Sequence, residues 1–455
     1  MDKSIFRAYD IRGIYPTELN ERDAYKIGRA IFEYTKPKTV AVGMDARLSA
    51  PAVHKAVMAG FLDLGCEVTD CGMTGTDMMS WASGAKDFDI TINISASHNP
   101  AHWIGMKIFK GGGASVGGNG EIVDIGSIAA DINYQLPINN DQLKGTKKMN
   151  LLPSWIQHVL SFVNKDKIKP FKIVVDAGNG VAGPIARELF QHLPVELVEM
   201  YFEPDGNFPN HLPSPIEPKN VADLRKRVKL EKADMGMAFD GDADRVFLID
   251  ERGGIVTGSE MTAMVMDEIL TQNPYHTVLH NKICGWNVRD VVKKHDAVAH
   301  PTLTGIGFIK LDMVKRDAFF AGEHSGHYYF KENFNCDSGL IAAIFVLALL
   351  SKRGESLSKV LKEYRQYVSI PETNFQVKDT DKVIEALAGK YQEGEIDRFD
   401  GLTVKFEDFW FNVRPSSNEP VLRLNVEAIN KAVLKEKSKK LSEFIASYSM
   451  IPTGV

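Results

Sequence analysis

Three acidic residues at alternating positions are the clearest candidates for chemistry in this sequence. Asp240, Asp242 and Asp244 fall in a short stretch that leads into the apolar run 246–249. Carboxylates at positions i, i+2 and i+4 of a loop can converge on one hard divalent cation, and without a cation they would repel one another. The spacing therefore predicts a divalent-metal site, with a solvated acidic turn as the alternative.

An EF-hand calcium site is a second alternative for the same stretch. Together with Glu251, the three aspartates fall at positions 1, 3, 5 and 12 of such a loop. Position 6 of that loop needs glycine but is Arg245 here. The flanking residues are β-branched or aromatic, which favours strands over helices. A calcium sensor is therefore disfavoured.

A serine-rich loop presents a hydroxyl group. Residues 95–100, with the sequence Ser-Ala-Ser-His-Asn-Pro, directly follow the apolar run 90–94. Taken alone, such a stretch is more often a turn than an active site. Ser97 and His98 are not expected to form a catalytic couple, because adjacent side chains on an extended segment point to opposite faces. We therefore expect no hydrolytic triad here.

Two further loops suit a polar ligand. Residues 322–327 carry a glutamate, a serine and two histidines between apolar segments, which suits hydrogen bonding to a polyol, with a metal site or a polar turn as alternatives. Residues 414–420, followed by Arg423, combine guanidinium, hydroxyl and amide groups that fit a phosphate. Glu419 is the one residue of this loop that argues against an anion.

The elements that must position these loops have an α/β pattern. Short β-rich runs alternate with amphipathic stretches over the first three quarters of the chain, which predicts βαβ units and mainly parallel sheets. The predicted strands are 39–42, 90–94, 172–175, 246–249 and 277–280, and the predicted helices include 25–34, 52–64, 184–192 and 288–295. Three times a short strand leads into one of the polar loops, which predicts three related units.

The pattern changes near residue 370. Residues 352–367 are predicted to form a charged amphipathic helix, which 369–372 then breaks before strand-like segments. The polar run 136–152 predicts another break. We therefore expect domains at 1–150, 151–253 and 254–367, and a smaller C-terminal α+β domain at 368–455.

Composition and charge exclude several classes of protein. The 455 residues are 44% hydrophobic and 25% charged, which is typical of a globular chain of about three domains. A net charge of -5 provides no basic field for a nucleic acid or an anionic membrane. The four cysteines show no zinc-like spacing, the N-terminus lacks a signal-type apolar run, and the apolar stretch 340–350 is predicted to be a buried core helix. We expect a cytoplasmic protein with no nucleic-acid, membrane or obligate protein partner.

Taken together, the four loops resemble those of the α-D-phosphohexomutases. In chain order, 95–100 is similar to that family's phosphoserine loop, 240–245 to its magnesium loop, 322–327 to its sugar loop and 414–420 to its phosphate loop. The opening residues 6–13 resemble the phosphomannomutase/phosphoglucomutase branch. The resemblance implies four domains around a central cleft: a phosphoserine, a magnesium-binding and a sugar-recognition domain of similar α/β topology, and a mobile C-terminal phosphate-binding domain.

The resemblance also implies roles for individual residues. Ser97 would carry the phosphoryl group and bind Mg²⁺ together with Asp240, Asp242 and Asp244. Catalysis would further involve Arg12, Lys107 and His327. Lys107 is favoured as the general acid/base, because nearby cations such as Arg12 and Arg245 should lower its pKa toward neutrality. The expected substrate contacts are Tyr9, Arg245, Glu323, Ser325, Arg414, Ser416, Ser417, Asn418 and Arg423.

The implied reaction interconverts hexose 1-phosphate and hexose 6-phosphate, with mannose and/or glucose as the sugar, through a phosphoserine and a bisphosphorylated intermediate. Mg²⁺ is the expected cofactor and a hexose 1,6-bisphosphate the expected activator. The alternatives are a phosphoglucosamine mutase, a magnesium-dependent sugar phosphatase and a non-catalytic binder. The chain departs from the family pattern at Ile104, at Ser417 and Asn418, and at Ile306, where some relatives have a histidine that contacts the sugar.

Overall fold

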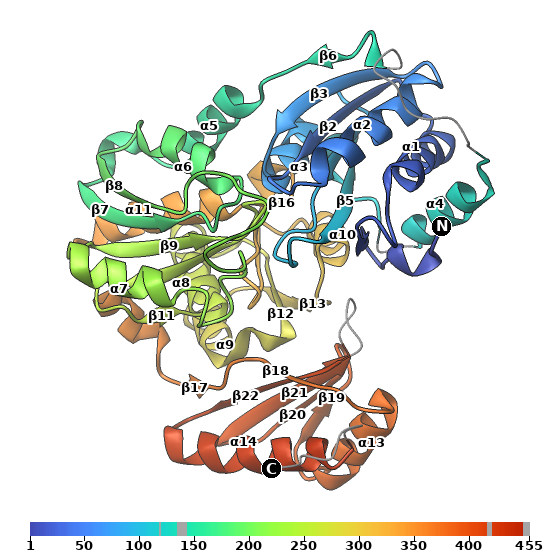
Figure 1. Ribbon diagram of the computed structural model, residues 1–455. Helices are drawn as coiled ribbons and strands as arrows, with labels where there is room; N and C mark the ends of the chain where they lie inside the picture. Colours follow the sequence, from blue (N-terminus) through green and yellow to red (C-terminus); the bar gives the residue numbers. More distant parts are fainter. Residues whose placement is uncertain (118–119, 134–142, 416–420, 449–455) are drawn as a thin grey trace.

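The computed structural model describes residues 1–117, 120–133, 143–415 and 421–448, and these residues form four β-sheets (Figure 1). The first sheet has the strand order β1-β5-β4-β2-β3-β6. Its strands are β1 (Ile11–Ile14), β2 (Thr39–Met44), β3 (Glu67–Met73), β4 (Ile90–Ile94), β5 (Trp103–Lys110) and β6 (Lys147–Lys148). Strand β2 pairs in parallel with β3 and β4, whereas β5 is antiparallel to both β4 and β1.

Helices alternate with the strands of this first sheet. They are α1 (Glu21–Thr35), α2 (Ala50–Leu62), α3 (Thr76–Ala85) and α4 (Glu121–Asp131). Of these, α2 and α3 connect the parallel strands β2, β3 and β4. Strand β4 is buried along its whole length, as its continuous apolar sequence predicts for a central parallel strand. The serine loop begins where β4 ends, at Ile94.

The second and third sheets share one hydrophobic core. The second has the order β11-β10-β9-β7-β8, and the third β13-β12-β14-β15-β16. Their strands are β7 (Phe171–Asp176), β8 (Val195–Met200), β9 (Met235–Phe239), β10 (Val246–Asp250), β11 (Ile255–Val256), β12 (Val278–Asn281), β13 (Ala299–Thr302), β14 (Phe320–Gly322), β15 (Tyr328–Phe330) and β16 (Cys336–Asp337). Their helices are α5 (Leu152–Ser161), α6 (Ala182–Phe190), α7 (Ala222–Glu231), α8 (Gly258–Gln272), α9 (Gly285–Lys294), α10 (Ile306–Arg316) and α11 (Gly339–Arg353).

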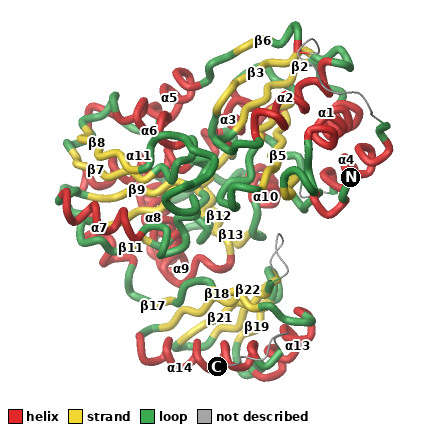
Figure 2. Tube along the Cα trace, in the orientation of Figure 1, coloured by secondary structure: helices red, strands yellow, loops and turns green. Residues whose placement is uncertain are grey.

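The C-terminal unit is built differently and has a core of its own. Its antiparallel sheet has the order β17-β22-β21-β20-β19, and β18 also pairs with β22. The strands are β17 (Val368–Ser369), β18 (Thr373–Phe375), β19 (Glu395–Asp397), β20 (Leu402–Lys405), β21 (Phe409–Pro415) and β22 (Leu422–Ala428). Helices α13 (Thr380–Lys390) and α14 (Lys431–Ala446) cover the face away from the other units (Figure 2).

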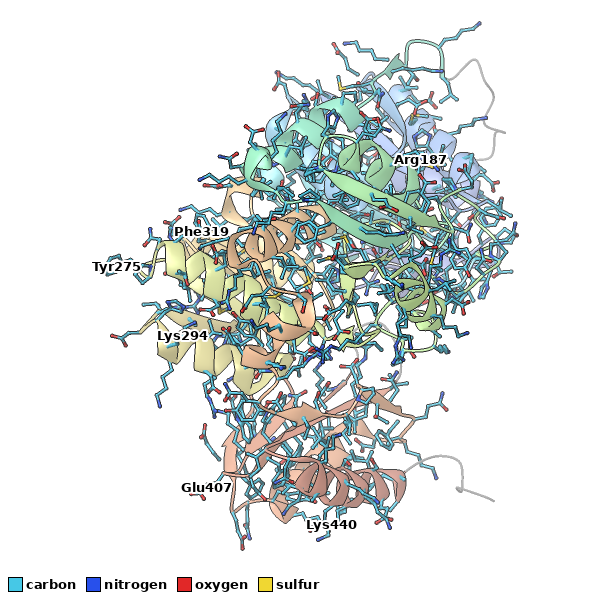
Figure 3. All side chains as sticks on the ribbon, turned by 90° about the vertical axis from the view of Figure 1, so that its left-hand side faces the viewer. Arg187, Tyr275, Lys294, Phe319, Glu407 and Lys440 are labelled. Atoms are coloured by element: carbon cyan, nitrogen blue, oxygen red, sulfur yellow. The ribbon has the colours of Figure 1, made fainter. Side chains whose placement is uncertain are left out.

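A side view also shows the C-terminal unit as a separate part of the molecule. In Figure 3, the unit that carries Glu407 and Lys440 lies apart from the body that carries Arg187, Tyr275 and Phe319. Three α/β units and a smaller α+β unit confirm the expected fold class. The second sheet includes β11 and so extends past the boundary expected at residue 253, because the turn at 251–254 closes a β10–β11 hairpin.

Most predicted elements form, with ends shifted by a few residues. The apolar stretch 340–350 is the buried helix α11, as expected. The loop 240–245 joins two antiparallel strands, β9 and β10, which excludes the paired helices of an EF-hand. All four cysteines are buried and carry free thiols. Among the described residues, no helix combines the length and the apolar character that crossing a membrane requires.

The predicted helix over 352–367 is wrong. Helix α11 ends at Arg353, because Gly354 takes a left-handed conformation and its N–H donates to the carbonyl of Leu350. A short helix, α12 (Leu357–Val360), and a 3₁₀ turn at Leu361–Tyr364 follow. Leu357, Val360 and Leu361 all point into the shared core. In the sequence, the charged residues between these apolar positions favour one continuous amphipathic helix.

Close packing of α1 on α2 gives a first prediction. A Cβ atom on Gly60 would lie 2.5 Å from the carbonyl oxygen of Tyr25, which is backbone and cannot give way cheaply. Gly389, in the exposed part of α13, has nothing within 4 Å of the equivalent position. Gly60→Ala should therefore destabilise the protein by about 1–3 kcal/mol, while Gly389→Ala should be neutral or stabilising. Thermal unfolding of both variants checks this, and equal melting temperatures would contradict it.

Candidate active site

The polar loops meet at one cleft of about 310 Å³. Its lining comes from all four units and includes Ser97, Arg245, Glu323 and Arg414. Of the side chains expected from the sequence, those that line the cleft are Tyr9, Arg12, Ser97, Lys107, Asp244, Arg245, Glu323, Ser325, His327, Arg414 and Arg423. Ser416, Ser417 and Asn418 lie outside the described residues.

Ser97 is bound to the acidic loop of the neighbouring unit. Its backbone is left-handed, with a φ of 51°, and its hydroxyl donates to Oδ2 of Asp240 at 2.7 Å. Ser95 adds a second link, because its hydroxyl accepts from the Ser97 N–H and donates to Asp242. The loops approach so closely that a Cβ on Gly241 would lie 2.6 Å from the carbonyl oxygen of Ser97. Only glycine fits at that point of the acidic loop.

A buried arginine shapes the serine loop from behind. The Arg47 guanidinium donates to the backbone carbonyls of Ser97, Asn99, Pro100 and Trp103. Its charge is balanced by Asp45, which lies 3.1 Å away. Neither residue belongs to a motif that the sequence made visible, so this support of the loop was missed.

His98 lies beside Ser97, so the expectation that the two side chains diverge is wrong. The His98 Nδ1 atom is 3.2 Å from the Ser97 hydroxyl and accepts from Arg245 at 2.6 Å. The expectation assumed an extended segment, but the left-handed backbone of Ser97 turns both side chains into the cleft. Burial, together with the charges of Arg245 and Arg12, lowers the pKa of His98 well below its usual value. A neutral imidazole that accepts from a guanidinium is a weak base for Ser97.

The acidic triplet has the chemistry of a divalent-metal site. Asp240, Asp242 and Asp244 are fully buried, and one oxygen of each lies within 4.8 Å of the others. Among the described residues, Oδ1 of Asp242 and Oδ1 of Asp244 have no hydrogen-bond partner. Burial raises the pKa of Asp240 to about 7, in spite of Arg245. Buried carboxylate oxygens without donors are costly, so an oxygen-liganded cation such as Mg²⁺ fits these residues.

The expectation that the pKa of Lys107 is lowered is wrong. Its ammonium group contacts Asp242 at 2.8 Å and Asp244 at 2.6 Å. Burial disfavours the charged form, but the aspartates outweigh burial and raise the pKa of Lys107 above its usual value. Only neighbouring cations can be inferred from the sequence, because the contact of Lys107 on β5 with the acidic loop forms only in the folded chain. Arg12, for its part, pairs with Asp10 and Asn99.

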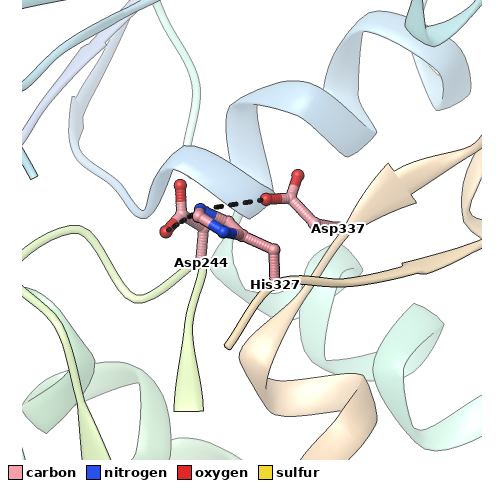
Figure 4. Close-up of side chains that lie close together, drawn as sticks. All are labelled: Asp244, His327 and Asp337. Atoms are coloured by element: carbon pink, nitrogen blue, oxygen red, sulfur yellow. Dashed lines mark ion pairs between the residues drawn. The ribbon is translucent and has the colours of Figure 1, made fainter. Parts of the chain in front are cut away.

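His327 lies among carboxylates. Its Nδ1 atom is 3.3 Å from Glu323, and its Nε2 atom is 3.8 Å from Asp244 and 3.9 Å from Asp337 (Figure 4). Burial opposes the imidazolium, but Glu323 and Asp244 outweigh it, so the pKa of His327 is raised. Burial also raises the pKa of Asp337 to about 6. Asp337 stands alone in the sequence, so nothing there pointed to it.

The sugar loop and the arginines complete the cleft. Glu323 accepts from the Tyr329 hydroxyl at 3.0 Å, while its Oε1 has no hydrogen-bond partner among the residues that the structure describes. Ser325 is hydrogen-bonded to His327. Arg414 and Arg423 lie opposite each other on β21 and β22, and both contact Glu372, which sequence reasoning missed.

Family models match the chain along most of its length. Their descriptions are those of phosphoglucomutase/phosphomannomutase: alpha/beta/alpha domain I at residues 3–129, domain II at 153–254, domain III at 257–367 and the C-terminal domain at 372–442. These four matches agree with the four sheets of the structure.

Individual relatives agree with the family models. A phosphomannomutase of Vibrio cholerae serotype O1 is 38% identical, over 97% of this chain and 98% of the relative. Proteins of Xanthomonas campestris named phosphohexose mutases are 36% identical over 97% of this chain and 98% of their own length. A crystal structure of a phosphoglucomutase/phosphomannomutase family protein from Burkholderia thailandensis matches with a TM-score of 0.88 and 30% identity, covering 98% of both chains. The chain therefore belongs to the phosphoglucomutase/phosphomannomutase family.

Proposed function

We propose that this enzyme interconverts hexose 1-phosphates and hexose 6-phosphates of mannose and glucose, through a phosphoserine at Ser97. The observation that carries this proposal is the arrangement of the cleft. The Ser97 hydroxyl lies against an acidic triplet in one part of its lining, and the C-terminal unit adds the Arg414 and Arg423 pair. A phosphosugar with one phosphate at the arginines presents its free hydroxyl to the serine. A hexose 1,6-bisphosphate would serve as the activator that loads Ser97.

Mg²⁺ is the cofactor that these residues would hold. Asp240, Asp242 and Asp244 would provide carboxylate oxygens, and Ser97 would add an oxygen of its phosphate. When bound, the ion neutralises negative charge on the transferring phosphoryl group. Arg245 supports the same charge from the protein side, because it donates to both Ser97 and Asp240.

Proton transfer falls to His327 in this arrangement. In the first half-reaction the bond between the Ser97 oxygen and phosphorus breaks, a bond from phosphorus to a sugar oxygen forms, that sugar hydroxyl loses its proton and the Ser97 oxygen takes one up. In the second half-reaction the bond from phosphorus to the other sugar oxygen breaks, the bond to the Ser97 oxygen re-forms, the Ser97 hydroxyl loses its proton and the sugar oxygen takes one up. A histidine can exchange a proton near neutral pH. Lys107, held by two carboxylates, stays protonated and stabilises charge instead. Arg12 also contributes positive charge at this end of the cleft.

Substrate contacts are divided between the two ends of the cleft. Arg414 and Arg423 hold the phosphate that is not reacting, and a guanidinium provides the fork of donors that a phosphate needs. Glu323 and Ser325 hold ring hydroxyls that the sugar presents in both orientations. Tyr9 packs against Gly305 beside Ile306, and all three residues line the cleft.

The alternative reactions have less support. The named relatives are phosphomannomutases and phosphohexose mutases, which does not favour a phosphoglucosamine mutase. A sugar phosphatase would need an aspartate nucleophile. Asp240, however, already accepts hydrogen bonds from Ser97 and Arg245. Asp242 likewise accepts a hydrogen bond from Lys107. Release of inorganic phosphate without isomer formation would support the phosphatase.

Removal of the phosphate carrier gives the most direct test. Ser97→Ala should lower mutase kcat by at least about 10³-fold, because the transfer has no acceptor. Intact mass spectrometry should find one phosphate on the wild-type protein and none on the variant. Ser127→Ala, at an exposed site on α4, is the matched control and should keep both phosphate and activity. Near-full activity of the Ser97 variant would overturn the assignment.

The metal site can be tested by one variant in the acidic loop and a control variant in the turn that follows β10. Asp242→Asn should lower kcat/KM by about 10²–10³-fold and weaken Mg²⁺ binding, since it removes one charge from the triplet. Glu251→Gln alters the twelfth position of the discarded EF-hand pattern, where the side chain bonds Ser358 instead, and should change neither. Titration with Mg²⁺ after EDTA treatment provides the measurement. Activity that survives EDTA would exclude a metal role.

Sugar specificity should be broad at C2. Ile306 lines the cleft and cannot hydrogen-bond a hydroxyl. We expect kcat/KM values for mannose 1-phosphate and glucose 1-phosphate within about 100-fold of each other, because one hydroxyl without a dedicated partner discriminates weakly. A glucosamine phosphate should be poorer. A coupled assay on the three substrates measures this, and a preference for the glucosamine phosphate would contradict the branch assignment.

A further inference from the structure

Glu372 bridges the two arginines of the phosphate end. It lies between β17 and β18, two strands of the C-terminal sheet. Its Oε1 lies 3.1 Å from Arg423, and its Oε2 lies 3.4 Å from Arg414 and accepts from the Asn425 amide at 3.0 Å. All of these partners lie on β21 or β22. The carboxylate therefore contacts the donors that a phosphate would use.

The charge of Glu372 is maintained in spite of burial. Its side chain is only 14% exposed, and that of Arg414 only 6%. Burial disfavours the carboxylate, but Arg414 and Arg423 outweigh it and hold the pKa of Glu372 below its usual value. A buried carboxylate would normally destabilise the folded protein, but the two guanidinium groups of the arginine pair offset its negative charge. The negatively charged Glu372 side chain thus lies within the site proposed to bind the substrate phosphate.

Glu372 also faces the opposite wall of the cleft. Burial lowers the pKa of His324 in the sugar loop, the charge of Glu372 opposes this shift, and Arg414 adds to it. Glu372, His324 and both arginines line the same cavity. The carboxylate therefore lies in the space between the sugar loop and the C-terminal unit.

We propose that Glu372 is an internal competitor for the phosphate end of the substrate. It offsets one of the two positive charges of the arginine pair in the free enzyme and repels a phosphate that binds there, which weakens phosphate binding. The inference rests on the proposed function, because the anion is taken to be the non-reacting phosphate of a phosphosugar. A bisphosphate that must reverse its orientation in the cleft has to be released from the phosphate site between the two half-reactions.

The test measures binding without turnover. Glu372→Gln keeps the shape of the side chain and its acceptor oxygen, but removes its charge. Isothermal titration in the presence of EDTA, with glucose 6-phosphate and separately with inorganic phosphate, should give Kd values about tenfold lower than for the wild type. The difference should shrink at high salt. Glu372→Ala removes the charge in a second way and should shift Kd in the same direction.

A matched control uses the same chemistry elsewhere on the C-terminal unit. Glu385 pairs with Arg398 through two hydrogen bonds on the exposed surface, so Glu385→Gln also takes a carboxylate from an arginine. This variant should leave both Kd values unchanged. Unchanged or higher Kd values in both Glu372 variants would overturn the proposal and make Glu372 a positioning residue for the arginines. Tighter phosphate binding by the Glu372 variants, together with a wild-type protein that has no mutase activity, would refute the proposed function and keep only the competition of Glu372 with anions at the arginine pair.

Discussion

The compensation of buried negative charge in the acidic loop is the constraint on which the rest of this structure depends. Asp240, Asp242 and Asp244 are removed from water, and carboxylates in that state are stable only beside cations or strong donors. Much of that compensation is provided by another unit: Lys107 on β5 contacts two of the aspartates, and Ser97 donates to the third. The first and second units must therefore pack together for either loop to keep its conformation. The same contacts therefore stabilise the packing of the two units and assemble the site.

The sheets explain why the loops meet. Strand β4 runs parallel to its neighbour β2, and the serine loop follows directly after its carboxyl end. The acidic loop likewise follows β9, which pairs in parallel with β7. The carboxyl ends of parallel strands are where α/β proteins place their ligands. Repetition of that unit brings three loops to one cleft, and the C-terminal sheet provides the fourth side.

Local patterns predicted much of the fold, and the motifs predicted much of the site. Strand β4, helix α11 and the acidic triplet could be read from the sequence because each has a strong pattern within a few residues. Two errors came from local left-handed backbone, at Gly354 and at Ser97. The others came from contacts between distant segments. The pKa of Lys107 is set by aspartates more than 130 positions away, as its contacts with Asp242 and Asp244 show. Asp337 and Glu372 are single acids with no pattern around them, so only the folded chain reveals that they face His327 and the arginine pair.

The two ends of the cleft differ in how firmly they are held. The serine and acidic loops belong to units tied by buried charge, whereas Arg414 and Arg423 lie on a unit with its own core. That unit meets the rest through polar links, such as the Lys282 pair with Asp397 and the hydrogen bond from the Trp286 N–H to Glu427, around a small apolar cluster. Polar interfaces of this kind favour relative motion of domains. The rigid end therefore suits phosphoryl transfer, which needs fixed geometry. The end on the separate unit suits the binding and release that the proposed bisphosphate intermediate would need in order to reverse its orientation.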